Sequence, residues 1–96
     1  MKKQPNYANK LFEDLGFKTE EATNLVLRSQ LMSAIQDYIT NHKLTQETVA
    51  QRLGVSRPRV SEIMNGKIHL FTIDKLIVLA EKLGQHVELV IRDEAA

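Results

Sequence analysis

The chain has 96 residues, and its 13 Lys and Arg residues nearly balance its 12 Asp and Glu residues, which gives a formal net charge of +1. This length is enough for one domain with a single hydrophobic core. The chain contains no cysteine, which excludes disulfide scaffolds and thiolate metal sites and fits a reducing cytoplasm. No long apolar stretch follows Lys2 and Lys3, so we expect a cytoplasmic protein without a signal peptide or a membrane span.

The N-terminal part divides into a polar segment and a short apolar segment. Residues 1–10 are polar and include Pro5, so we expect them to be flexible. The next seven residues carry four large apolar side chains, Leu11, Phe12, Leu15 and Phe17. Such a segment is too apolar for a free tail, and it must pack on the chain's own core, on a second subunit or on a partner protein.

A long helical segment is predicted from Thr19 to about Asn41. Thr19 can cap its first turn, and the carboxylates of Glu20 and Glu21 favour the positive end of the helix dipole. Apolar residues recur along one face of this segment, at Leu27, Leu31, Ala34, Ile35 and Tyr38. The pattern permits either one continuous helix or two helices with a break near Arg28.

Residues 45–64 predict two short helices that meet at a sharp turn. Thr45 can cap the first helix, and Gly54 can take the positive φ with which many helices end. Ser56 can cap the second helix, whose first turn tolerates Pro58 because that position needs no N–H donor. The positions that would face the core are Val49, Ala50, Leu53, Val60 and Ile63.

Such a pair is typical of the helix-turn-helix motif, in which the second helix enters the DNA major groove. An ordinary helical hairpin in an all-α domain is the alternative interpretation, because capped amphipathic helices are common. We favour the motif because the small, glycine, capping and apolar positions all occur in register.

The segment after the motif predicts a turn, a last helix and a strand. Gly66 can supply a turn, Thr72 can cap the helix and Gly84 can end it. The inner face of this helix would carry Ile73, Leu76, Ile77, Ala80 and Leu83. Residues 86–92 alternate as a strand does, with Val87, Leu89 and Ile91 on one side.

No second strand is evident for residues 86–92 to pair with. A lone strand leaves a row of unpaired backbone groups, so we expect it to pair antiparallel with its copy in a homodimer. Val87, Leu89 and Ile91 would then be buried against the last helix. The alternatives are that the strand folds back on its own domain or joins a sheet in a partner protein.

Basic residues concentrate in the predicted motif, although the whole chain is nearly neutral. The charges from residue 43 to residue 67 are Lys43, Arg52, Arg57, Arg59 and Lys67, against Glu47 and Glu62. Acidic residues gather outside it, at Glu13, Asp14, Glu20, Glu21, Asp93 and Glu94. A locally basic face on a neutral chain favours a sequence-specific nucleic-acid binder over a non-specific coating protein.

The second helix of the motif carries the residues that we expect to contact DNA. Arg57 can make a two-pronged contact to guanine O6 and N7, whereas Pro58 can offer only an apolar contact, such as one to a thymine methyl group. Phosphate contacts are expected from Arg59, Asn65 and Lys67.

Glu62 also faces the expected DNA, and a carboxylate near phosphates costs energy. This cost is offset if Glu62 accepts from cytosine N4 or pairs with Arg57 or Arg59; both alternatives remain open. Elsewhere, the side chains of His42, His69 and His86 do not have metal-ligand spacing, and neither Ser56 nor Ser61 has the sequence context of a nucleophile. We therefore expect no enzyme activity, metal, cofactor or small-molecule ligand.

From Ser33 to Lys67 the chain resembles the Xre/Cro/cI family of helix-turn-helix DNA-binding domains. The matching segments are Leu44-Thr45-Gln46, Val49-Ala50, Leu53-Gly54-Val55-Ser56, Val60-Ser61, Ile63 and Asn65-Gly66-Lys67. The resemblance implies an all-α, lambda-repressor-like bundle of about five helices, to which we add the short C-terminal β-strand. It also places residues 57, 58 and 62 at bases and Gln46 at a phosphate of double-stranded operator DNA. The predicted DNA-binding residues are thus Gln46, Ser56, Arg57, Pro58, Arg59, Ser61, Glu62, Asn65 and Lys67.

The flanks of the motif narrow the resemblance to short HigA-type antitoxins, which are encoded beside a RelE-like toxin. The segments that carry it are Phe12-Glu13-Asp14-Leu15-Gly16-Phe17 and Gly66-Lys67-Ile68-His69-Leu70-Phe71. This resemblance implies a repressor that autoregulates its operon and neutralises a RelE/HigB-like ribonuclease toxin. We expect a small basic toxin to contact Phe12, Leu15 and Phe17, beside the acidic Glu13 and Asp14. The alternatives are a stand-alone phage-type repressor and a protein-interaction module that has lost DNA binding.

These expectations divide the chain into an N-terminal arm (residues 1–18), a DNA-binding domain (19–85, with the motif at 45–64), a C-terminal strand (86–92) and a tail (93–96).

Overall fold

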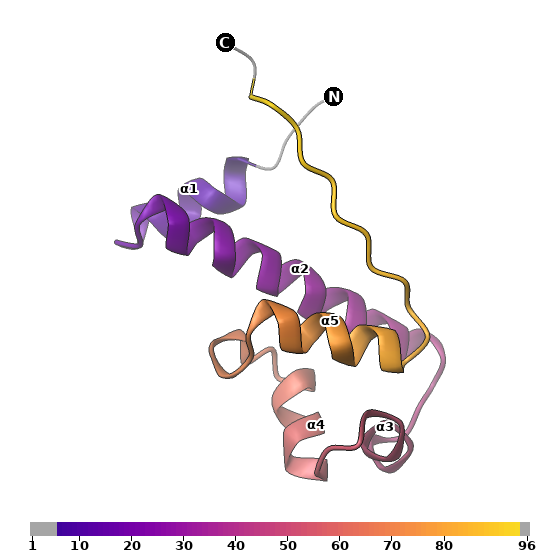
Figure 1. Ribbon diagram of the computed structural model, residues 1–96. Helices are drawn as coiled ribbons and strands as arrows, with labels where there is room; N and C mark the ends of the chain where they lie inside the picture. Colours follow the sequence, from indigo (N-terminus) through magenta and orange to yellow (C-terminus); the bar gives the residue numbers. More distant parts are fainter. Residues whose placement is uncertain (1–5, 95–96) are drawn as a thin grey trace.

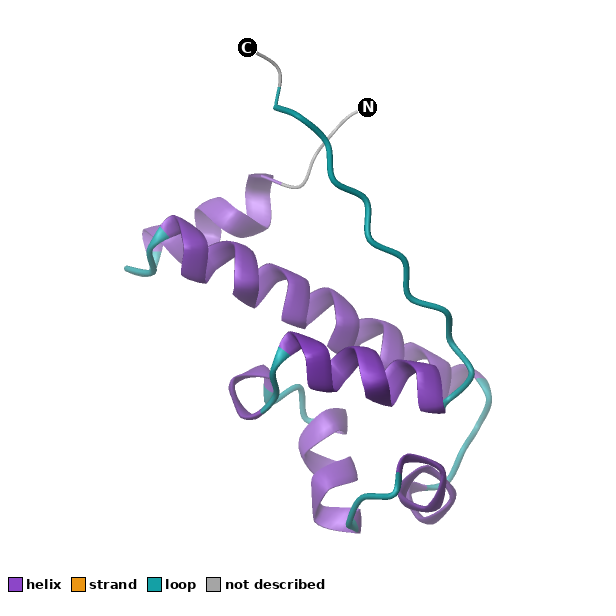
Figure 2. Ribbon diagram, viewed as in Figure 1, coloured by secondary structure: helices purple, strands orange, loops and turns teal. Residues whose placement is uncertain are grey.

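The computed structural model describes residues 6–94, and within them the regular structure is helical (Figures 1 and 2). The elements are α1 (Asn6–Asp14), α2 (Thr19–Asn41), α3 (Gln46–Leu53), α4 (Arg57–Met64), the 3-10 helix η1 (Ile68–Leu70) and α5 (Ile73–Lys82). The predicted all-α fold is confirmed. None of the helices in this part of the chain is long and apolar enough to cross a membrane.

Helix α2 is continuous, which decides between the two alternatives that its sequence permits. It forms the long axis of a molecule that measures 47 × 26 × 20 Å. Helix α1 packs against α2, and α5 lies along the other half of α2 (Figure 1). Helices α3 and α4 close the end of the bundle that is far from α1.

The N-terminal part differs from the prediction in two ways. The predicted flexible segment is helical from Asn6 onward, because it forms the first turns of α1; residues 1–5 lie outside the described part. Thr19 is also not the cap of α2. The backbone N–H of Lys18 donates instead to Glu21 Oε1 at 3.1 Å, while the Thr19 hydroxyl donates to Glu13 Oε2 at 2.6 Å. Thr19 therefore links α1 to α2 rather than capping its own helix.

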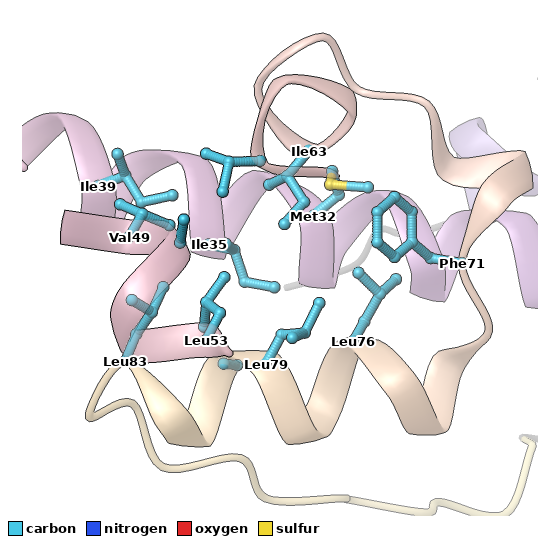
Figure 3. Close-up of a cluster of buried hydrophobic side chains, with 13 residues drawn as sticks. Met32, Ile35, Ile39, Val49, Leu53, Ile63, Phe71, Leu76, Leu79 and Leu83 are labelled. Carbon is cyan, nitrogen blue, oxygen red and sulfur yellow. The ribbon is translucent and has the colours of Figure 1, made fainter. Parts of the chain in front are cut away.

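One hydrophobic core joins α2, α3, α4 and α5 (Figure 3). Its fully buried side chains include Ile35 of α2, Leu53 of α3, Ile63 of α4 and Leu79 of α5. The buried members of this core are Met32, Ile35, Ile39, Val49, Ala50, Leu53, Val60, Ile63, Phe71, Leu76, Leu79, Ala80 and Leu83. Because the five predicted motif positions are all among them, the predicted inward faces of both motif helices are confirmed.

The predicted caps and the turn of the motif are present. The Thr45 and Ser56 hydroxyls accept from the backbone N–H groups three residues later, at 3.1 and 3.3 Å. Gly54 has φ +68°, the left-handed conformation that glycine adopts at low cost. Thr72 caps α5 in the same way, accepting from the N–H of Lys75 at 3.2 Å. These local bonds fix where α3, α4 and α5 begin, as predicted.

The C-terminal segment is extended but is not a strand in the single chain. It leaves α5 after Gly84 and runs back past α2 (Figure 1). A strand is defined by backbone pairing, and residues 86–92 have no ladder partner within the described chain. Val87 packs against the core, whereas Leu89 and Ile91 are 79% and 83% exposed. Of these three residues, only Val87 packs against the core of the single chain. The burial of all three was predicted for the dimer, and it stays a prediction.

Candidate nucleic-acid interface

Helix α4 is held to the bundle along one face only. Val60 and Ile63 are fully buried, and the Gln36 side chain of α2 donates to the Ile63 carbonyl at 2.7 Å. The Ile63 carbonyl belongs to the last turn of α4, and it also accepts from the backbone N–H of Gly66 at 3.0 Å. The opposite face of α4 remains at the surface, and its N-terminus lies at the end of the molecule that is far from α1 (Figure 1).

The first turn of α4 carries an accessible cation. Arg57 and Pro58 are exposed, and within residues 6–94 the Arg57 guanidinium has no hydrogen-bond or ion-pair partner. Gln46, the first residue of α3, and Lys67, just after α4, are exposed as well. The structure thus leaves these four predicted DNA-binding side chains open to solvent.

Arg59, for which a phosphate contact is predicted, is bonded within the protein. Its guanidinium donates to Glu62 Oε1 at 2.8 Å and to the Leu70 carbonyl at 3.1 Å. It also lies over the Phe71 ring, 4.1 Å from the ring centre. Of the two alternatives for Glu62, the structure contains the pairing with Arg59.

The remaining predicted residues lie at the two ends of α4. Ser56 serves as the N-cap described above, so its hydroxyl already accepts one hydrogen bond. The Asn65 amide, just after the last turn, donates to the half-buried Ser61 hydroxyl at 3.3 Å. Asn65 is exposed, and these polar groups remain close to the surface that α4 presents.

The sequence did not indicate the polar residues that position this surface. Arg28 of α2 donates to the carbonyls of Ile68 and Phe71, at 3.2 and 3.3 Å, and so ties down the segment after α4. Gln36 does the same for α4 itself. Both residues bond to segments that are distant in the sequence. The one feature of the sequence that could have pointed to them is their position as polar residues beside the apolar face of α2.

Two hollows lie away from α4. The first has a volume of about 570 Å³ and is lined by Phe17, Glu20, Glu21, Asn24, Leu25, Arg28 and His69. Leu15, 67% exposed, and Phe17, 40% exposed, belong to the predicted toxin-binding segment, and Phe17 meets Phe12 edge to face at 5.9 Å.

The second hollow, of about 450 Å³, is formed by α2, α5 and the C-terminal segment. Its apolar lining includes Leu27, Ile77, Val87 and Leu89. Among the described residues, no three His, Asp or Glu side chains gather as the ligands of a metal ion would.

Comparison with known proteins agrees with this geometry. The family model of the helix-turn-helix domain matches residues 11–92. A solved structure named "Putative XRE Family Transcriptional Regulator" is 34% identical to this chain, with a TM-score of 0.72, and the match covers 77% of this chain and 83% of that one. No curated protein matches the chain. The chain therefore belongs to the Xre-type helix-turn-helix family.

Proposed function

We propose that this protein is a sequence-specific DNA-binding transcriptional repressor. The observation that carries the proposal is the open face of α4. This face begins with Arg57, whose guanidinium has no partner among residues 6–94, and the opposite face of the helix is buried in the core. In helix-turn-helix proteins the second helix lies in the major groove with its N-terminal residues at base edges. The XRE regulator named above shares this fold with the present chain.

The proposed contacts divide into base recognition and phosphate binding. Arg57 would contact guanine O6 and N7 through its two-pronged guanidinium, and Pro58 would offer an apolar contact beside it. Gln46, at the start of α3, and Lys67, after α4, would bind phosphates and fix the register of the helix. Ser56, Ser61 and Asn65 would border this contact surface.

Binding to the promoter of the protein's own gene tests the proposal. We expect specific duplex binding that weakens steeply with salt, because basic side chains displace counterions from phosphates. Fluorescence anisotropy at several salt concentrations would measure both the affinity and the salt slope. Absence of binding at low salt would instead favour a protein-interaction module that has kept the fold.

Replacing Arg57 with alanine should relax the base preference at one operator position and cost about 1–3 kcal/mol of binding free energy. Lys67→Ala is the matched control, since it also removes one exposed cation. We expect it to weaken binding to all DNA sequences similarly. It should also reduce the slope of log affinity against log salt concentration by about one unit. Titrations of operator variants changed one base pair at a time would measure the difference. If Arg57→Ala weakened binding to every operator variant equally, Arg57 would not contact a base.

We further propose that the repressor is the antitoxin of a toxin–antitoxin pair. It would regulate its own operon and neutralise a small basic ribonuclease toxin of the RelE/HigB type. The support is the first hollow, in which the apolar Phe17 and Leu25 lie beside the carboxylates of Glu20 and Glu21, with exposed Leu15 nearby in sequence. An acidic, partly apolar surface is complementary to a basic partner. A stand-alone phage-type repressor remains the alternative, and a neighbouring gene for a short basic protein would distinguish the two.

Replacing Leu15 with arginine should abolish toxin neutralisation while leaving the fold and DNA binding unchanged. The side chain is 67% exposed, so the substitution costs little folding energy, but it places a positive charge on the surface proposed for a basic toxin. Thr40→Arg, which adds the same charge at an exposed position at the other end of α2, is the control. Growth rescue upon co-expression with the neighbouring toxin would measure neutralisation. Full rescue by Leu15→Arg would refute this contact surface.

We also propose that the repressor is a homodimer joined through residues 86–92. Two copies of α4, one per subunit, would then bind half-sites one helical turn of DNA apart. The support is the exposed apolar side chains of this segment, at Leu89, Val90 and Ile91, together with an extended backbone that has no ladder partner in the described part of the chain.

A further inference from the structure

Arg59 joins the recognition helix to the segment that follows it. The guanidinium donates through one terminal nitrogen to Glu62 on the next turn of α4, and through the other to the carbonyl of Leu70 in η1. Its flat face lies 4.1 Å from the centre of the buried Phe71 ring. Three independent contacts thus fix the guanidinium, and the carboxylate that it holds is fixed with it.

The contacts leave part of the Glu62 carboxylate available. Only Oε1 accepts from Arg59, and Oε2 has no hydrogen-bond partner within residues 6–94. The side chain is 33% exposed and lies one turn after Arg57 and Pro58, the other two residues predicted to contact bases. An ionised carboxylate offers about four acceptor positions, so Glu62 can keep its bond to Arg59 while it accepts a second bond from outside.

We propose that Arg59 is a positioning residue for base recognition and not a phosphate contact. It holds Glu62 so that Oε2 accepts from the exocyclic amino group of a cytosine in the major groove, the donor that a carboxylate there recognises. The inference rests on the proposed DNA-binding function. Its new element is the role of Arg59, which holds the Glu62 carboxylate, whereas the resemblance to the family already implies a base contact at residue 62. Neutralisation by Arg59 also offsets the repulsion between Glu62 and the phosphates.

A guanidinium is needed for this role, not merely a positive charge. Lysine would keep the charge but lacks the planar fork that bonds Glu62 and Leu70 while stacking on Phe71. Arg59→Lys therefore keeps the positive charge at residue 59 but removes the contacts that position Glu62. Arg52→Lys is the matched control, because Arg52 is an exposed arginine of α3 with no hydrogen bond or ion pair among the described residues.

The test begins with DNA selected by the wild-type protein from a pool of randomised duplexes. The preference for each base is then measured at every position of the selected site. We expect one position at which cytosine is preferred by about tenfold or more. Glu62→Gln should shift the preference there toward adenine, the base that glutamine recognises. Arg59→Lys should flatten the preference at that same position, and Arg52→Lys should leave it unchanged.

A second variant tests the alternative that Arg59 contacts a DNA phosphate. It also keeps the inference testable if Arg59→Lys folds poorly. Arg59→Met/Glu62→Gln replaces a neutral ion pair by two neutral side chains, and the methionine can still pack on Phe71. We expect its salt slope to equal that of the wild type. A slope lower by about one unit would show that Arg59 contacts a phosphate and would overturn the inference.

The outcomes also separate this inference from the proposed function. If the wild-type protein selects no sequence from the pool, the DNA-binding proposal fails and this inference fails with it. If it selects a site but Arg59→Lys leaves every base preference unchanged, or alters a position other than the one altered by Glu62→Gln, only the inference fails.

Discussion

Replacing Leu89 with proline is expected to convert the proposed dimer into monomers while each subunit keeps its helical fold. Proline has no N–H donor and interrupts the ladder that an antiparallel pair needs. Leu89 is 79% exposed, and residue 89 makes no backbone hydrogen bond within the described chain. Within residues 6–94 the substitution therefore removes no backbone hydrogen bond and little buried surface. The variant thus tests assembly separately from folding. Sedimentation at micromolar concentration would measure the dimer, and circular dichroism the helix content.

The loss of the dimer should weaken operator binding far more than any single DNA contact does. When two binding helices are linked, the second binds at a high effective concentration, which typically contributes about 10²–10⁴ in affinity. Asp93→Pro is the control, since it introduces the same residue just beyond the predicted strand. A Leu89→Pro protein that still sediments as a dimer would rule out residues 86–92 as the contact and direct attention to the apolar hollow between α2 and α5.

The helix-turn-helix motif was predictable because its signals are local. Thr45 and Ser56 bond to N–H groups only three residues away, and Gly54 adopts positive φ for a reason that lies within its own backbone. The buried positions of α3 and α4 also follow from helical spacing alone. The caps and the glycine turn predicted where both helices begin and end, and the buried positions predicted which face of α4 is exposed to solvent.

The sequence was least informative where distant or competing contacts decide the structure. The Thr19 hydroxyl could cap α2, but it donates a hydrogen bond to the Glu13 carboxylate of α1 instead. Arg59 has the chemistry of a phosphate ligand, but Leu70 and Phe71, more than ten residues later, hold its guanidinium. Residues 86–92 alternate as a strand does, yet a strand also needs a partner, which a single chain does not supply. The composition and the periodicity of the sequence do not show which distant residues or second chains a side chain or a strand will contact.

Replacing Leu53 with alanine should remove a large fraction of the stability of the fold. Leu53 is fully buried where α3 meets α2 and α5, close to Leu79 and Leu83 (Figure 3). Such a truncation costs about 2–5 kcal/mol, because it loses apolar burial and leaves a cavity that the neighbours fill only in part. A domain of this size has a total stability of about 5–15 kcal/mol. Urea denaturation at fixed protein concentration would measure the difference.

DNA binding should weaken together with stability in Leu53→Ala, because Leu53 is the last residue of α3 and the next residue, Gly54, begins the turn that aims α4. Val78→Ala on α5 is the matched control: it also shortens an aliphatic side chain, but this one is 45% exposed, so we expect a change below about 1 kcal/mol. If Leu53→Ala also cost less than about 1 kcal/mol, the junction of α3 with α2 and α5 could not be the rigid support that holds the recognition helix.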